Sequence, residues 1–473
     1  MSITSILNIA KNALSVNQAS VQVTSHNISN VNTEGYARQE VILEEEAPSL
    51  IGTAFLGNGV RVSGVIRYYD KYLDQQISKK NTELGEQQVY KKYFKRIESA
   101  LNEDNTKLTE NITSFFNAWQ ELSTDPQSVS AREGIAASGQ NMKRSINSIY
   151  NGLKDIQIEL NNNIKMEIAD INRIVASIAD LNNRIFEGSS GSSEANDYLD
   201  KRTQYVKELS GKIDIISFED QYGRMSVLTS KGKALVDGGN SWELGVMNDD
   251  ETGFYKVGWK DSSGNLTDIT DDISGGSIHG LVEMRDGQIN DFITDIDKLA
   301  EVIITEVNDI HTAGYTLNHD PADLNADGIP FFEEITENYA KNIDLSEKVK
   351  TDLKNIAASS GVDAAGSPIG NDIALNISAL MDENIFNGGT STIVNYTSSI
   401  TNRIGQLTKG ANDFAQYSED TMQAMEKQRE SVSGVSLDEE MANLMKYQYA
   451  FQASSRLFTV ADELFQSILE AVR

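Results

Sequence analysis

Residues 437–473 read LDEEMANLMKYQYAFQASSRLFTVADELFQSILEAVR, and this stretch decides the fold class. Large apolar side chains recur at every seventh residue, which is the spacing of a stripe along one side of an α-helix. Such a stripe could pack on the rest of its own chain. Because residues 3–28 are too short to cover all of it, we expect helices of other subunits or of a partner protein to do so. This C-terminal seam consists of Leu437, Leu444, Phe451, Phe458, Phe465 and Val472.

The first 30 residues carry a similar pattern. Apolar residues again recur at steps of seven, which predicts a second amphipathic helix. A chain that begins and ends in heptad helices is typical of a helical bundle in which the two ends lie side by side. This N-terminal seam consists of Leu7, Leu14, Val21 and Ile28.

The middle of the chain is mostly helical, with one β-rich interruption. Apolar residues at steps of three or four from Met142 to Ile185 predict one long helix, and the whole chain has only five prolines to interrupt helices. From about residue 212 to 280, short apolar runs alternate with glycine and aspartate, which predicts a small inserted β domain. We therefore expect an elongated α+β protein with several domains: terminal coiled-coil helices at 1–40 and 435–473, a helical bundle with short β segments at 41–190 and 281–434, and an outer β domain at 191–280.

Composition excludes several classes of protein. The 473 residues include 41 basic and 70 acidic side chains, a net charge of −29, whereas a free-standing nucleic-acid binder needs a basic face. The absence of cysteine excludes disulfides and thiolate metal sites. The N-terminus has no conventional secretory signal, and no apolar run reaches the roughly 18 residues of a membrane span. We expect that, if the protein leaves the cytoplasm, it does so without a cleaved signal peptide.

Signatures of catalysis are absent. The sequence contains no P-loop, no zinc-binding histidine pair around a glutamate and no nucleophile elbow, so we expect neither enzymatic activity nor a cofactor. One weak metal candidate has the spacing of a calcium loop, with Gly328 at its turn. Pro330 lacks the backbone N–H that such a loop uses, and we favour an ordinary polar turn without a metal. The candidate ligands are Asp323, Asn325, Asp327 and Glu334.

Residues 25–39 read SHNISNVNTEGYARQ and carry a resemblance to a known family. This stretch resembles the N-terminal motif of bacterial flagellar axial proteins, the superfamily of rod, hook and hook-associated subunits. Its YARQ ending, together with GNGVRV at 57–62, FFNAWQELS at 115–123 and SVSGVSLDEE at 431–440, is similar to the hook-associated protein 1 family, whose members form the hook-filament junction. The residues that match the axial-protein motif are Asn27, Asn30, Thr33, Gly35, Tyr36, Arg38 and Gln39.

The resemblance implies a structural adaptor. Subunits would leave the cell through the flagellar type III export apparatus and assemble, outside the cell, into a ring between hook and filament, with the terminal helices forming an inner tube. The implied partners are further copies of the chain, the hook protein, a second junction protein (hook-associated protein 3) and an export chaperone that binds the C-terminal helix. We expect no nucleic acid and no membrane insertion. Phe332 and Tyr396 lie too close in sequence to hold the extra β domain of larger relatives, so we expect that domain to be absent.

Two other interpretations remain open. Another axial subunit, a hook or filament protein, would share the motif, although a hook subunit would devote its middle to β structure where this chain predicts a long helix. An acidic calcium-binding surface protein would fit the net charge and the loop at Asp323. Repeats of that loop would favour such a protein, and the sequence has none.

Overall fold

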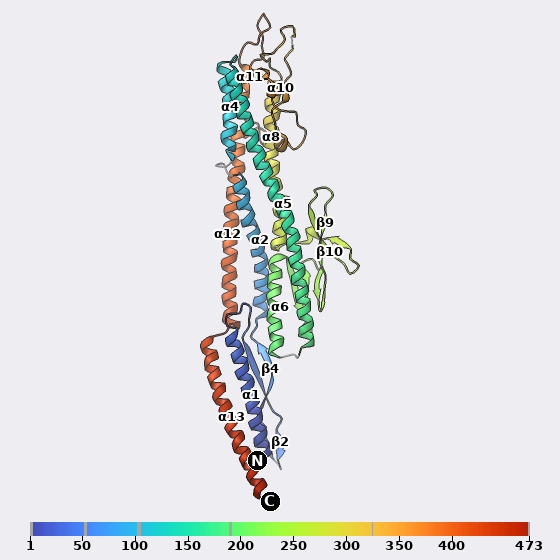
Figure 1. Cartoon of the computed structure of the whole chain (residues 1–473), viewed down its shortest axis with the longest axis vertical. Helices are drawn as coiled ribbons and strands as arrows, with labels where there is room; N and C mark the ends of the chain where they lie inside the picture. The colour runs from blue at the N-terminus through green and yellow to red at the C-terminus, as the bar shows by residue number, and fades with distance from the viewer. Residues whose placement is uncertain (1–2, 52–53, 102–105, 189–191, 324, 472–473) are drawn as a thin grey trace. The chain divides into compact units, whose positions relative to one another are not determined.

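The computed structural model describes residues 3–51, 54–101, 106–188, 192–323 and 325–471 (Figure 1). Long helices dominate, and the strands form small antiparallel sheets, so the predicted α+β fold class is confirmed. Val472, the last residue of the predicted C-terminal seam, lies outside the described residues.

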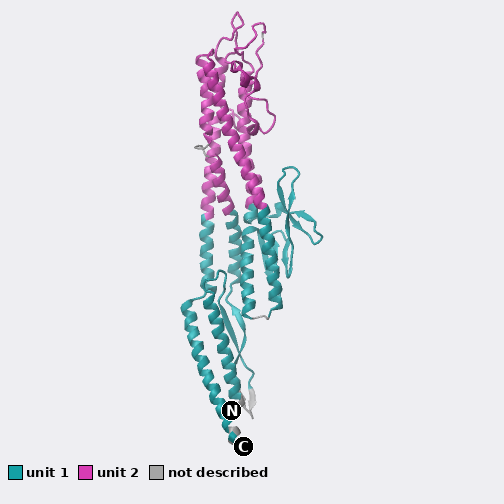
Figure 2. Cartoon of the chain, viewed as in Figure 1, with its two compact units in different colours: residues 1–86, 165–279, 416–473 teal, residues 87–164, 280–415 magenta. Residues whose placement is uncertain are grey.

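The chain divides into two compact units, each built from separate stretches of sequence (Figure 2). Unit 1 comprises residues 1–86, 165–279 and 416–473, and unit 2 comprises residues 87–164 and 280–415. Three long helices contribute residues to both units: α2 (Lys71–Leu101), α5 (Val129–Glu187) and α12 (Ile393–Ser433). The three-part domain division expected from the sequence stays a prediction.

Both ends of the chain belong to unit 1. Helix α1 (Ile3–Ser29) packs along helix α13 (Leu437–Ala471), which confirms that the two ends lie side by side (Figure 1). Strands β1 (Gln39–Glu45) and β4 (Val60–Arg67) pair antiparallel and pack against α1, with a bulge between Ile42 and Leu43. The short strands β2 (Ser49–Ile51) and β3 (Ala54–Leu56) follow β1 and precede β4 in the sequence, and they pair with each other antiparallel.

Helix α6 (Ser193–Lys212) leads from α5 into the inserted β region. The Ser192 side chain caps α6 by accepting the backbone N–H of Ala195. The inserted strands form a four-stranded sheet, β5-β6-β7-β8, and a three-stranded sheet, β11-β10-β9, all antiparallel. Their bounds are β5 (Ile215–Glu219), β6 (Met225–Thr229), β7 (Ala234–Asp237), β8 (Asn240–Ser241), β9 (Leu244–Asn248), β10 (Tyr255–Lys260) and β11 (Leu266–Asp268).

The long helix α5 forms because its apolar residues keep a helical period without a proline. Residues such as Leu153, Ile156 and Leu160 are buried along one face, as the spacing predicts. The structure extends this helix beyond the predicted 142–185 at its N-terminal end. None of the described helices is both long enough and apolar enough to cross a membrane.

Unit 2 has a core rich in aromatic side chains. Trp119 on α4 (Leu108–Thr124) contacts Phe331 and the fully buried His311 at the end of α8 (Ile289–His311). A short π-helix, η2 (Met284–Gln288), joins α8 to α7 (Gly276–Glu283). The remaining short elements are η1 (Thr270–Asp272), α9 (Tyr339–Asn342), α10 (Glu347–Thr351), η3 (Leu353–Asn355) and α11 (Asp372–Ala379).

Candidate functional site at the paired ends of the chain

Asn27 is the centre of the polar contacts that hold the two ends of the chain together. Its side chain is 1% exposed. Its Nδ2 donates to the backbone carbonyl of Gln39 at 2.9 Å and to Oε2 of Glu440 at 3.0 Å. Its Oδ1 accepts the backbone N–H of Gln39 at 3.0 Å and the hydroxyl of Tyr36 at 2.7 Å. The amide therefore pairs with Gln39 as a neighbouring peptide group would, and both of its donor hydrogens and both acceptor lone pairs are used.

Glu440 and Arg38 complete the link between α13 and the motif. The Glu440 side chain is 2% exposed, and its Oε1 accepts from Nε of Arg38 at 2.8 Å. Arg38 also donates its backbone N–H to the carbonyl of Ser433 at 2.8 Å and lies 3.5 Å from the carboxylate of Glu439. Because a buried carboxylate is costly unless it is paired and hydrogen-bonded, Glu440 depends on both Arg38 and Asn27.

Helix α6 supplies two carboxylates to the same motif. Oδ2 of Asp200 accepts the backbone N–H of Ala37 at 2.9 Å, and Oδ1 accepts from Arg67 at 2.6 Å. Oδ1 of Asp197 accepts from Nε2 of Gln39 at 2.9 Å. The motif thus joins α1, α13, α6 and the β1-β4 pair within unit 1.

Burial and charge fix the protonation states of these groups. Burial, followed by the charges of Asp197, Asp200 and Glu440, raises the pKa of Tyr36 far above its ordinary value, so its hydroxyl remains a donor to Asn27. Burial works to lower the pKa of Arg38, but its hydrogen bond to Glu440 and the charge of Glu440 outweigh burial and raise it. The site is a set of fixed hydrogen bonds, and its arrangement suits mechanical joining of elements.

The other motif residues lie on the loop after α1. Asn30 caps the helix end through its Nδ2, which donates to the carbonyl of His26 at 3.0 Å, and its Oδ1 accepts from the exposed Thr33 at 3.1 Å. Gly35 has φ +82°, a left-handed conformation that favours glycine, and its carbonyl accepts from Arg429 at 2.8 Å. Two grooves, of about 780 and 380 Å³, flank this loop. The structure therefore uses Asn27, Tyr36, Arg38 and Gln39 as internal contacts and leaves the loop tip accessible.

The contact between α1 and α13 uses small and polar residues at heptad spacing. On α13 these residues are Glu440, Tyr447, Ser454 and Ala461, a row beside the predicted C-terminal seam. On α1 they include the buried Ala10 and Thr24, with Asn17 between them donating to Ser454 at 3.3 Å. Because small side chains let two helices approach closely, this row holds the pair together while the larger side chains lie beside it.

Some residues of the predicted seams lie at the edge of the contact between α1 and α13, and others lie outside it. Leu444 of the C-terminal seam is half-buried, and so are Leu7, Leu14, Val21 and Ile28 of the N-terminal seam. Phe458 is 39% exposed, although it is a large apolar side chain on a helix that already has a partner. The exposed large apolar residues of α13 are Leu437, Met441, Met445, Tyr449, Phe451, Leu457, Phe458, Val460, Leu464 and Phe465.

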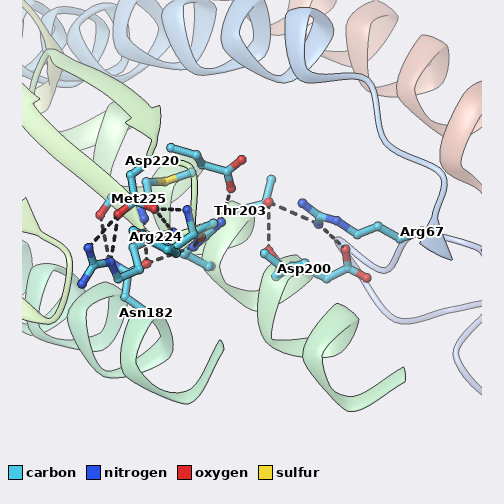
Figure 3. Close-up of polar contacts among 12 residues, drawn as sticks. Arg67, Asn182, Asp200, Thr203, Asp220, Arg224 and Met225 are labelled. Atoms are coloured by element: carbon cyan, nitrogen blue, oxygen red, sulfur yellow. Dashed lines mark hydrogen bonds and ion pairs between the residues drawn. The ribbon is translucent and has the colours of Figure 1, made fainter. Parts of the chain in front are cut away.

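A second buried asparagine anchors the inserted sheet to α5. Asn182, which is fully buried, donates to the carbonyls of Met225 at 2.8 Å and Gly238 at 2.6 Å. Its Oδ1 accepts from the backbone N–H of Met225 at 3.0 Å and from the buried Arg202 at 2.9 Å. Figure 3 shows this contact together with Arg67, Asp200 and Thr203. Like Asn27, Asn182 clamps the N–H and carbonyl of one extended residue.

The weak calcium candidate is a turn whose side chains bind one another. Oδ1 of Asp323 accepts the backbone N–H of Asn325 at 3.0 Å. The carboxylate of Asp327 accepts from Thr316 at 2.6 Å and contacts His319 at 2.9 Å, while Glu334 is exposed. Across the described stretches of the chain, no three histidine, aspartate or glutamate side chains form a group that could hold a metal ion.

Comparison with protein families matches residues 94–332, about half of the chain, to the helical domain of flagellar hook-associated protein FlgK. The chain belongs to the FlgK family of flagellar hook-associated proteins. Its ends match two further flagellar families. Residues 7–36 match the flagella basal body rod proteins, and residues 427–471 match the C-terminal domain of the basal body rod FlgEFG proteins.

Flagellar hook-associated proteins are similar to the chain over almost its whole length. Flagellar hook-associated protein 1 of Bacillus subtilis is 26% identical and that of Salmonella typhimurium 25%, each alignment covering 98% of this chain and at least 98% of the relative. A solved structure, the flagellar hook junction protein FlgK from Burkholderia pseudomallei, aligns with a TM-score of 0.64 at 14% identity, covering 76% of this chain and all of that one. That likeness supports the fold.

Membership of the FlgK family makes the chain a structural component of the flagellum, and the resemblance drawn from residues 25–39 is confirmed. The sequence did not reveal the roles of Glu440, Asp200 and Asn182. Glu440 follows two other acidic residues, and nothing in the sequence distinguishes the buried one. The available signal was the heptad row of small and polar residues from Glu440 to Ala461, which a search for apolar periodicity passes over.

Proposed function

We propose that the chain is an adaptor that polymerises into a ring between hook and filament, and that its subunits meet through the outer surfaces of α1 and α13. The observation that carries this proposal is the apolar surface of α13, which stays exposed although α1 already occupies one side of the helix. Exposed apolar patches on such a scale mark interaction surfaces.

The contacts at Asn27 would give this surface its geometry. A helix pair that assembles with neighbours must present its two outer faces in a fixed register. Asn27, Glu440 and Arg38 fix that register at the ends of the helices nearest the rest of unit 1. Small side chains then keep α1 close to α13, so that the row containing Phe451, Phe458 and Phe465 is available to other chains.

The partners follow from this arrangement. Further copies of the chain would bury the apolar surface in lateral contacts between neighbouring subunits of a ring. The hook protein would contact one side of that ring and hook-associated protein 3 the other. Before export through the flagellar type III apparatus, a chaperone would cover the α13 surface and prevent premature polymerisation. Burial of one phenylalanine contributes roughly 1.5–3 kcal/mol, so several in a row suffice for either interaction.

Electron microscopy of cells that lack this protein tests the proposal. We expect hooks without filaments, and we expect expression of the intact chain to restore the filaments. Normal filaments in the deletion strain would contradict the role at the junction. Loss of the hook as well would point to a hook or rod subunit.

A further inference from the structure

In unit 1, helix α1 packs against two neighbours, α13 and the pair of strands β1 and β4. Figure 1 shows α1 between them, with α13 on one side and the strands on the other. Each of these neighbours has a face that points away from α1. The burial and charge of the two faces decide whether they can bind each other.

The face of the β1-β4 pair that points away from α1 is apolar at its centre. Val41 lines a small cavity together with Val23 of α1, so its side chain points toward that helix. Successive side chains of a strand point to opposite faces, which places Ile42 on the far side, together with Ile66 opposite Glu40. Ile42 is 39% exposed and Ile66 is 45% exposed. We call the surface made of Glu40, Ile42 and Ile66 the ribbon face.

Acidic side chains surround the isoleucines of the ribbon face. Arg61 pairs with Glu44 across the two strands at 2.8 Å. Glu40 accepts the hydroxyl of Tyr68. Residues 40–46 contain four glutamates, Glu40, Glu44, Glu45 and Glu46. Because these glutamates outnumber the arginine, the ribbon face is apolar at its centre and acidic around it.

Helix α13 also turns a regular face away from α1. The row that contacts α1 includes Tyr447, Ser454 and Ala461. Because an α-helix turns about 100° per residue, side chains two positions before or after these residues point to the opposite side. All five such side chains from 445 to 459 are exposed, and Tyr449 is 71% exposed. We call them the back face: Met445, Tyr449, Gln452, Arg456 and Thr459.

The back face is basic, although the chain as a whole is acidic. Between Met441 and Ala461 the sequence has two charged residues, Lys446 and Arg456, and both are cations with exposed side chains. Residues 3–29 of the neighbouring α1 add Lys11 and no carboxylate. The back face thus offers apolar and cationic side chains, which complement the isoleucines and glutamates of the ribbon face.

We propose that the ribbon face of each subunit binds the back face of α13 in an adjacent copy of the chain. This inference rests on the proposed assembly into a ring, because subunits related by rotation join two different faces and repeat that contact from copy to copy. The ribbon face and the back face lie on opposite sides of α1 and carry opposite charges. Burial of Ile42, Ile66 and Tyr449 stabilises the contact, and the charges fix which face meets which.

Disulfide crosslinking tests this contact, because the chain has no cysteine of its own. Ile42→Cys is combined with one cysteine on the back face, and each double variant is expressed in cells that lack the wild-type chain. Hooks and filaments are isolated, oxidised with copper phenanthroline and analysed by non-reducing electrophoresis. A disulfide needs Cα atoms within about 7 Å, which the intervening α1 prevents inside one chain. The back-face substitutions are Met445→Cys, Tyr449→Cys, Gln452→Cys and Thr459→Cys.

We expect at least one pair to give a ladder of dimers and larger oligomers, because each chain offers one cysteine to each neighbour. The single variants should give no ladder. Dimers from Ile42→Cys alone would show that like faces meet, and an adduct with a different protein would show another occupant; either result would overturn the proposal. So would the absence of a ladder from every pair in hooks that carry normal filaments, and the role at the junction would then still stand.

Charge reversal gives a second readout that needs no disulfide. Lys446→Glu together with Arg456→Glu places like charges opposite the ribbon face of the next copy. We expect at least about tenfold fewer filaments per cell. Adding Glu44→Lys and Glu45→Lys to the same chain should restore most of the filaments, because the two faces again carry opposite charges.

The matched control reverses two other exposed lysines of unit 1, Lys79 on α2 and Lys201 on α6, and should leave filament number unchanged. All variants should keep the wild-type hydrogen exchange of α1 as purified monomers, because the substituted side chains are exposed. Normal filaments with both cations of the back face reversed, or no recovery when the ribbon glutamates are reversed as well, would overturn the contact. Normal filaments in cells without any copy of the chain would instead contradict the role at the junction.

Discussion

The side-chain amide of Asn27 donates to the carboxylate of Glu440 at 3.0 Å, across 413 positions of the sequence. Both side chains are almost completely buried, and each needs the other. Without Glu440 one amide hydrogen of Asn27 would be unpaired, and without Asn27 the carboxylate would rely on Arg38 alone. Together with the Arg38–Glu440 ion pair, this hydrogen bond links the two ends of the chain where α1 and α13 join the rest of unit 1.

Asn27→Asp should loosen the pairing of α1 with α13. An aspartate loses both donor hydrogens and places a carboxylate against Glu440 and against the carbonyl of Gln39. We expect a loss of about 3 kcal/mol or more in the stability of the helix pair. Hydrogen exchange across α1 measures it. The exposed Asn32→Asp is the matched control and should leave exchange unchanged; equal effects of the two changes would refute the role of Asn27.

Asn182→Ala should detach the four-stranded sheet from α5. The change leaves the N–H of Met225 and the carbonyls of Met225 and Gly238 without partners in a buried place, at about 1–3 kcal/mol each. We expect faster exchange in β6 and β7 while α1 keeps its protection. Asn162→Ala, at an exposed position of α5, controls for the loss of an asparagine from the helix. Unchanged exchange in β6 would show that the sheet does not depend on this clamp.

The stability of unit 2 should fall as pH is lowered from about 6.5 to about 4. His311 is buried; its Nδ1 donates to the carbonyl of Ile329 at 2.6 Å, and its Nε2 accepts the N–H of Ala357 at 2.9 Å. Burial lowers the pKa of His311 from 6.5 to about 4. As pH is lowered, His311 takes up a proton in the unfolded chain before it does so in the folded one. The free energy of unfolding therefore falls by about 2 kcal/mol between pH 7.5 and 5.

Thermal unfolding at several pH values checks this prediction for His311. His311→Gln lowers stability at every pH but should remove this part of the pH dependence. A variant with the same slope as the wild-type protein between pH 7.5 and 5 would contradict the assignment.

Calcium should not stabilise the protein. The oxygens of Asp327 are engaged with Thr316 and His319. Even a site with a dissociation constant of 1 mM would add only about 0.4 kcal/mol at 1 mM ion. We therefore expect the melting temperature to stay constant when calcium is added or chelated. Calorimetric binding tighter than about 10 μM would show that the turn is an ion site.

Apolar periodicity made much of this fold predictable. The long helix α5 and the two terminal helices have large aliphatic or aromatic residues at helical spacing, and the turn-rich stretch of short apolar runs gave the inserted sheets. Apolar periodicity could not identify the residues with which α1 and α13 contact each other, because Ala10, Ser454 and Ala461 are small or polar. Local spacing also cannot tell which asparagine meets a distant backbone, as Asn27 and Asn182 do.

Substitutions in the row of small residues on α13 and in its row of large residues should therefore have different effects, the first on the pairing of α13 with α1 and the second on assembly. Ala461 is 1% exposed and packs in the row that faces α1, whereas Phe458, three residues earlier, is 39% exposed. A glutamate at 461 would force a charge into a closely packed contact. A glutamate at 458 would remain partly in solvent and would affect the surface that other subunits need.

The most direct test measures exchange in α1 and filament formation for the same pair of variants, Phe458→Glu and Ala461→Glu, each expressed in cells that lack the wild-type chain. We predict that Phe458→Glu keeps the wild-type protection of α1 in the purified monomer but yields hooks without filaments. Ala461→Glu should lose both. Val460→Glu, at a position 53% exposed, should behave like Phe458→Glu. If Phe458→Glu removed the protection of α1 as fully as Ala461→Glu does, or if it supported normal filaments, the outer surface of α13 would not be the assembly surface.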